Sequence, residues 1–187
     1  MKRGLSRRKF MQIAVTAAAA GPVISCTGTR SPWRFFTVAE ARTLEAACER
    51  IIPADQDPGA AWAGVVAFID RQLMGPYKRH RTIYRQSVAG LDQSSGILFG
   101  KNFIWLAADQ QDLVLARLER GDAPGDLWKK QSPQRFFELL MNHTMQGFYG
   151  DPRHGGNRDG ISWRMLGLSY PPVRGRLHYD LRKREQS

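Results

Sequence analysis

The chain has 187 residues, 42% of them hydrophobic, with 28 Lys and Arg against 17 Asp and Glu, a net charge of +11. This length favours one domain preceded by a leader, and the hydrophobic content is sufficient for a core. No RNA- or DNA-reading motif accompanies the excess of basic residues, so the charge does not indicate a nucleic-acid-binding protein.

Residues 1–26 have the layout of a secretory signal, a charged start followed by the short apolar run Ile13–Ala20. The start, Ser6-Arg7-Arg8-Lys9-Phe10-Met11, resembles the S-R-R-x-F-L pattern of twin-arginine signals, with Met11 in the Leu position. Such signals are used for proteins that are exported already folded. We therefore predict that Arg7 and Arg8 carry a twin-arginine signal and that the protein is periplasmic.

The end of this leader, Val23-Ile24-Ser25-Cys26, is similar to a lipobox, in which Cys26 would be lipidated and become the new N-terminus. A lipid there would hold the protein at a membrane face. Cleavage after Ala20, or no cleavage, are the alternatives. If Cys26 is lost or lipidated, Cys48 remains alone, and its place in a helical pattern is typical of a small buried residue.

Helical periodicity dominates the middle of the chain. A first helix is predicted from the capping box of Thr37 and Glu40 to the residues before Pro53. A second helix is expected from Asp57-Pro58, with Asp57 as N-cap, to Gly75-Pro76. Tyr77–Leu91 suggests a third helix, and Gln93–Asn102 is expected to be a break because it contains two serines and two glycines.

The second half continues in the same pattern. Phe103–Leu106 is a short apolar run, either a buried strand or the approach to the helix predicted at Ala108–Arg120, which Gly121 would end. A loop or one short turn follows at Asp122–Lys130. Ser132 and Pro133 then begin the clearest helix of the chain. No stretch shows sustained strand alternation, so we expect an all-α domain of about five helices.

That last helix leads into Gly147–Tyr170, which has five glycines in its first fourteen residues and is bracketed by the aromatic residues Phe148, Tyr149, Trp163 and Tyr170. Glycine permits positive φ and close backbone approach, whereas aromatic residues supply more apolar surface than a flexible linker carries. We interpret the stretch as a long Gly-rich loop that docks a partner or has a structural role, followed by an extended C-terminal arm. A lid over the protein's own core and a small-molecule site are the alternatives.

Sequence motifs for catalysis are sparse. The histidines His80, His143, His154 and His178 show no metal-ligand spacing, and motifs for haem attachment, dinucleotides and phosphate loops do not occur. His143, Asp151 and His154 could form the metal site of a small periplasmic metalloenzyme, but separate roles in the core or on the surface are favoured. We therefore expect no catalytic residue, metal site or cofactor site in this chain.

Four features resemble the gluconate 2-dehydrogenase subunit 3 family, over roughly residues 35–172. They are the twin-arginine leader, Arg50-Ile51-Ile52-Pro53-Ala54-Asp55, the Phe103–Gly121 segment, and Gly147–Asn157 followed by Trp163. The last is the most specific, since the family pattern is G-x-x-x-x-P-x-Y-G-G-N followed by a tryptophan. His154 stands here in the place of the usual tyrosine.

The resemblance implies a non-catalytic small subunit of a periplasmic, membrane-associated, flavin-dependent sugar or polyol dehydrogenase. Its partner would be a large FAD-containing flavoprotein of the glucose–methanol–choline type, often with a multihaem cytochrome c, and the small subunit would escort the flavoprotein in export and stabilise it. Docking to that partner would use Phe148, Tyr149, Pro152, Gly155, Gly156, Asn157 and Trp163.

The expected division of the chain is a signal over 1–26, a linker over 27–36, a helical domain over 37–172 and a basic tail over 173–187. The alternative function is that of a free-standing basic lipoprotein, bound to the membrane or cell wall through Cys26 and the basic tail.

Overall fold

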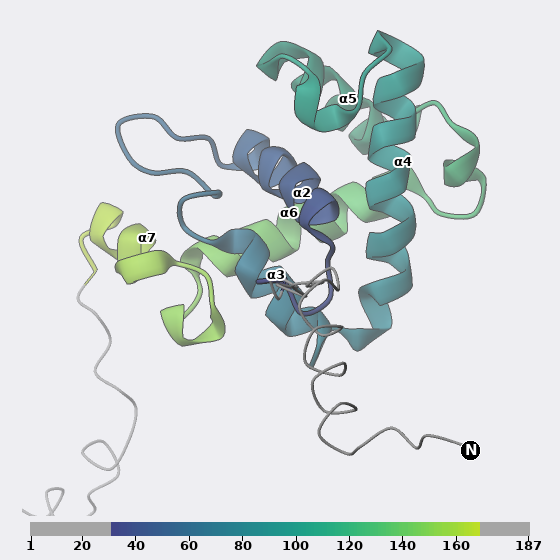
Figure 1. Ribbon diagram of the computed structural model, residues 1–187. Coiled ribbons are helices and arrows are strands. Elements are labelled where there is room, and N and C mark those ends of the chain that lie inside the picture. Colours follow the sequence, from purple (N-terminus) through teal and green to yellow (C-terminus); the bar gives the residue numbers. More distant parts are fainter. Residues whose placement is uncertain (1–30, 169–187) are drawn as a thin grey trace, which may run out of the picture. The chain divides into compact units, whose positions relative to one another are not determined.

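The computed structural model describes residues 31–168, which form six α-helices joined by loops and short 3-10 turns, with no strand among these residues (Figure 1). This confirms the all-α prediction. The helices are α2 (Val38–Ile51), α3 (Val65–Leu73), α4 (Arg81–Phe99), α5 (Ala108–Arg120), α6 (Pro133–Tyr149) and α7 (Ile161–Met165). The 3-10 turns are η1 (Lys78–His80), η2 (Phe103–Trp105), η3 (Asp126–Lys129), η4 (Pro152–His154) and η5 (Arg158–Gly160). The predicted signal, the lipobox and the basic tail lie outside the described residues.

Three helix ends lie where capping residues in the sequence predict them. The Thr37 hydroxyl accepts a hydrogen bond from the Glu40 amide, and the Thr37 amide donates to the Glu40 carboxylate at 2.8 Å, so α2 begins with the expected capping box. Ser132 caps α6 by accepting from the Arg135 amide. Gly121 ends α5 with a φ of 83°, a conformation that favours glycine.

The predicted start of the second helix is wrong. Residues 53–64 form a loop, and α3 begins only at Val65, after Gly64 with a φ of 75°. The reason is the Glu49 carboxylate on α2, which accepts hydrogen bonds from the amides of Ala54 (2.9 Å) and Ala61 (2.8 Å). These bonds hold the loop in a bend and satisfy backbone donors that a helix would otherwise have used.

The predicted break at Gln93–Asn102 is also wrong, because α4 continues to Phe99 and ends at Gly100. The two serines have partners that keep them in the helix. The Ser95 hydroxyl donates to the Leu91 carbonyl at 2.7 Å, and the Ser94 hydroxyl donates to the Pro124 carbonyl at 2.6 Å while it accepts from the Trp128 indole. Residues 103–106 are not a strand; they contain the turn η2.

The hydrophobic core centres on α6, which contacts each of α2, α3, α4 and α5. Its buried side chains Phe136, Leu140 and Phe148 pack among fully buried residues of the other helices, such as Leu44 and Ile69. Cys48 is buried in this core, as the sequence predicts, and accepts a hydrogen bond from the Thr144 hydroxyl at 3.2 Å.

The segment just before α2 is fixed to the core by a buried carboxylate. Asp70 on α3 is 3% exposed and accepts hydrogen bonds from three consecutive amides, those of Arg34 (2.8 Å), Phe35 (2.9 Å) and Phe36 (3.0 Å). The Arg85 guanidinium lies 4.4 Å from the centre of the Phe35 ring. Charge-assisted hydrogen bonds of this kind are stronger than neutral ones. They hold residues 34–36 against α3, and we call the three bonds the Asp70 clamp.

Candidate functional site

The Gly-rich segment folds back onto α6 around one buried side chain. Asn157 is completely buried and has a φ of 45°. Its side-chain amide donates to the Gly150 carbonyl at 2.8 Å, and its side-chain oxygen accepts from the Ser162 amide at 3.0 Å. A single side chain therefore joins the end of α6 to the start of α7, and residues 150–160 form a compact corner (Figure 1).

The glycines of this corner are required by close packing. A Cβ atom at Gly156 would lie 2.1 Å from the carbonyl oxygen of Gly147, a backbone atom of α6 that cannot move aside. Gly155 has a φ of 108°, in the region that side chains disfavour. The Gly-Gly-Asn sequence is thus explained by contact with the protein's own α6.

The corner is also joined to the loop before α3 and to α3 itself. The Arg158 amide donates to the Ala63 carbonyl at 3.0 Å, and the Arg158 guanidinium lies 5.5 Å from the centre of the Trp62 ring. The Arg71 side chain on α3 donates to the Arg153 carbonyl at 3.0 Å. Segments almost a hundred residues apart in sequence therefore form one surface.

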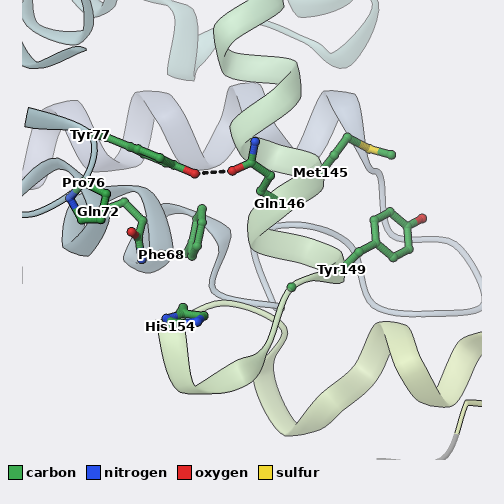
Figure 2. Close-up of a pocket in the computed structure, with 9 residues that line it drawn as sticks. Phe68, Gln72, Pro76, Tyr77, Met145, Gln146, Tyr149 and His154 are labelled. Atoms are coloured by element: carbon green, nitrogen blue, oxygen red, sulfur yellow. Dashed lines mark hydrogen bonds between the residues drawn. The ribbon is translucent and has the colours of Figure 1, made fainter. Parts of the chain in front are cut away.

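Beside this corner lies a largely apolar groove of about 630 Å³, which we call the Tyr149 groove (Figure 2). It runs between α3, the two residues just before the turn η1, the last turns of α6 and the turn η4. The residues that line it are Phe68, Gln72, Pro76, Tyr77, Met145, Gln146, Tyr149, Gly150 and His154. Figure 2 shows Tyr77 and Gln146 pointing toward one another from opposite sides, joined by a hydrogen bond from the Tyr77 hydroxyl.

A buried histidine supports the wall of the groove. The Tyr77 ring stacks on the His143 ring with 4.2 Å between their centres, and the His143 Nδ1 atom is 2.9 Å from the Tyr84 hydroxyl. Burial, with smaller contributions from His80 and Arg79, lowers the pKa of His143 to about 4. His143 is therefore neutral at physiological pH and has a packing role here.

The structure brings together only part of the set predicted for docking. Tyr149 is exposed and lines the groove, whereas Pro152 and Trp163 are partly buried beside it. The Trp163 indole donates to the Tyr149 carbonyl at 3.0 Å. Phe148, Gly156 and Asn157 are buried and Gly155 is partly buried, so any contribution of theirs to docking is through the shape of the segment.

Two further differences concern the predicted loop and arm. Residues 147–149 belong to α6, so the loop begins at Gly150, and Ile161–Met165, within the stretch expected to be loop, form α7. The arm beyond Leu168 lies outside the described residues.

Two of the three residues of the hypothetical metal site have other partners. His143 contacts Tyr84 as described, and the Asp151 carboxylate is paired with the Arg153 guanidinium, which lowers the pKa of Asp151 to about 2. Within residues 31–168, no group of three His, Cys, Asp or Glu side chains is placed to hold a metal ion.

Sequence reasoning did not identify the opposite wall of the groove, formed by Phe68, Gln72, Pro76 and Tyr77. One signal was available on α6. Met145 and Tyr149 are four residues apart and so lie on the same side of the helix, outside the stripe that the core uses. Both are large apolar residues that remain exposed, which is typical of a surface that binds something.

The sequence matches the family model described as gluconate 2-dehydrogenase subunit 3 over residues 38–169. This match covers all six described helices, the Gly-rich corner and both walls of the groove. No curated protein and no solved structure matches the chain. Among the described residues, no helix is long and apolar enough to span a bilayer.

Proposed function

Because the chain belongs to the gluconate 2-dehydrogenase subunit 3 family, we propose that it is the non-catalytic small subunit of a periplasmic, flavin-dependent sugar or polyol dehydrogenase. In this role it binds the large catalytic flavoprotein, stabilises it and escorts it through export. FAD is held by the large subunit, and a multihaem cytochrome c is a possible third component.

The observation that carries this proposal is the extent of the family match, which spans the helical domain from α2 to the end of α7. The family is described as a subunit, so its members are expected to work within an assembly. The Tyr149 groove supports the same conclusion, because exposed methionine and tyrosine side chains around a concave apolar surface are typical of protein interfaces.

The escort role rests on the predicted leader. A twin-arginine signal suits a flavoprotein that must bind its cofactor before it crosses the membrane, because the signal exports folded proteins. The motif Ser6-Arg7-Arg8-Lys9-Phe10 stands about thirty residues before α2. The Asp70 contacts hold residues 34–36, the end of the predicted linker, against α3.

Co-expression of the tagged full chain with the reading frames adjacent to its gene tests both parts of the proposal, the subunit role and the escort role. We expect the two proteins to co-purify with the absorption of oxidised flavin, near about 450 nm, and to appear together in the periplasm. A colourless tagged protein without the flavoprotein would contradict the subunit proposal and favour the free-standing lipoprotein.

Replacement of both signal arginines separates escort from binding. In the double variant Arg7→Lys and Arg8→Lys, the flavoprotein should remain in the cytoplasm while the complex still forms. Arg3→Lys, which keeps the same charge outside the motif, is the matched control and should export normally. Periplasmic flavoprotein in the double variant would refute the escort role and leave the subunit role standing.

A further inference from the structure

The Tyr149 groove offers a defined surface for one kind of partner segment. None of its nine lining residues, all within the described range, carries a carboxylate, and its walls are formed mainly by Phe68, Tyr77, Met145 and Tyr149. Methionine adapts its shape to different apolar partners, and tyrosine anchors interfaces at low entropic cost. The groove is therefore suited to bury an apolar side chain of another segment.

Charged residues at the edge of the groove are mostly basic. Arg71 precedes the lining residue Gln72, and Lys78 and Arg79 follow the lining residue Tyr77; all three are exposed. Arg79 is close enough to Tyr77 for its charge to act on the pKa of that phenol, which burial raises overall. A carboxylate near this edge, that of the partly buried Asp151, is paired with Arg153. The edge therefore favours an occupant that carries negative charge.

Three occupants can be compared on charge. The chain's own segment after Leu168 has five basic residues against two acidic ones, so the edge of the groove disfavours it. A second copy of the chain would have to present an acidic apolar segment of its own. The catalytic subunit, which the proposed function requires to bind this protein, is the remaining occupant.

Resting on that proposed function, we infer that the Tyr149 groove binds a segment of the catalytic flavoprotein in which an apolar side chain is flanked by Asp or Glu. The apolar side chain enters between Tyr77, Met145 and Tyr149, and the carboxylates meet Lys78 and Arg79. The Gly-rich corner holds Tyr149 and His154 in place on one side of this contact.

Site-specific cross-linking tests the position of the contact. A benzophenone amino acid replaces Tyr149 in the tagged full chain, which is co-expressed with the flavoprotein and irradiated. Leu113, an exposed residue of α5 that takes no part in the groove, is the matched control position. We expect a cross-link to the flavoprotein from position 149 and none from position 113, with the linked peptide containing Asp or Glu beside an apolar residue.

The other outcomes overturn the inference in distinguishable ways. A complex that purifies without a cross-link at position 149 would refute the groove and leave the subunit role intact. A cross-link to a second copy, or to the chain's own C-terminal segment, would assign the groove to that occupant instead. Absence of any complex would refute both the groove and the proposed function.

Two variants test the chemistry of the contact on a folded protein. Met145→Glu places a charge in the groove, whereas Met141→Glu, one turn earlier on α6 and similarly exposed (39% against 44%), does so outside it. We expect recovery of the flavoprotein to fall about tenfold for Met145→Glu alone, as for the loss of an interface anchor. Equal recovery with the two variants would refute the contact, provided that both melt like the wild type.

The charge of the edge is tested in the same way. The double variant Lys78→Glu and Arg79→Glu should lower recovery of the flavoprotein, and the recovery that remains should no longer decrease as salt is added. Lys101→Glu with Lys130→Glu, at exposed positions outside the groove, is the matched control. Retained binding by the first pair would overturn the acidic character of the occupant.

Discussion

Acid should destabilise the helical domain through His143, a residue that is 4% exposed. Burial lowers its pKa from an ordinary value of 6.5 to about 4. Between these values the unfolded chain binds a proton that the folded protein does not accept, so protons favour unfolding. The stabilisation is therefore complete above pH 6.5 and is lost as the pH falls from 6.5 through about 4.

The size of the effect follows from the shift. A difference of about 2.5 pKa units corresponds to about 3 kcal/mol in total, of which about 2 kcal/mol is lost by about pH 5. Urea unfolding of the full chain, followed by tryptophan fluorescence at about pH 7.5 and about pH 5, measures this loss. His143→Gln offers the Tyr84 hydroxyl an amide as hydrogen-bond partner but cannot titrate, so it should lose about 2 kcal/mol less than the wild type.

His154→Gln is the control, because this histidine is exposed at the edge of the corner and its replacement should leave the loss unchanged. The reasoning would be refuted if the wild type and His143→Gln lost equal stability over this pH range. Since Tyr77 stacks on His143, acid should also disturb the wall of the Tyr149 groove.

Three further predictions concern the packing of the domain. Asp70→Asn leaves one acceptor oxygen for three amides and should cost about 2 kcal/mol, with faster proteolysis of residues 31–37; unchanged cleavage would contradict the clamp. Gly90→Ala places a Cβ atom 2.6 Å from the Trp128 indole and should lower the melting temperature. Gly96→Ala in the same helix meets no atom and should raise the melting temperature. A higher melting temperature for Gly90→Ala than for Gly96→Ala would contradict the packing of Trp128 on α4. Burial raises the pKa of the Cys48 thiol to about 12, so peptide mapping should find it unlabelled by maleimide until urea unfolds the protein.

Helix ends that depend on neighbouring residues were predictable from the sequence. The box of Thr37 and Glu40, the Ser132-Pro133 pair and Gly121 each act within a few residues, so their pattern identifies the boundary. The start of α3 and the continuation of α4 depend on partners far along the chain. Glu49 bonds to Ala61, and Ser94 bonds to residues about thirty positions away, and no local pattern reveals such contacts.

The candidate site also combines features that local sequence predicts with features that depend on long-range contacts. The Gly-rich segment was recognisable because its glycines and Asn157 are clustered within a short stretch of sequence. That Gly156 packs against Gly147 and that Asn157 spans the corner could be seen only in the structure. The Tyr149 groove combines residues near position 70 with residues near position 150, so it exists only after α3 and α6 have packed.

The Asp70 clamp limits which residues can occupy positions 34–36. The carboxylate accepts hydrogen bonds from the main-chain amides of Arg34, Phe35 and Phe36, so these bonds do not depend on which side chains the three residues carry. Nineteen amino acids can supply such an amide, and proline alone cannot. In relatives that keep an aspartate at this position of α3, proline should therefore be excluded from all three positions. Side chains should vary freely only at the exposed position 34, because Phe36 is buried in the core and Phe35 packs against it. A different leader joined ahead of residue 34 should leave the clamp intact.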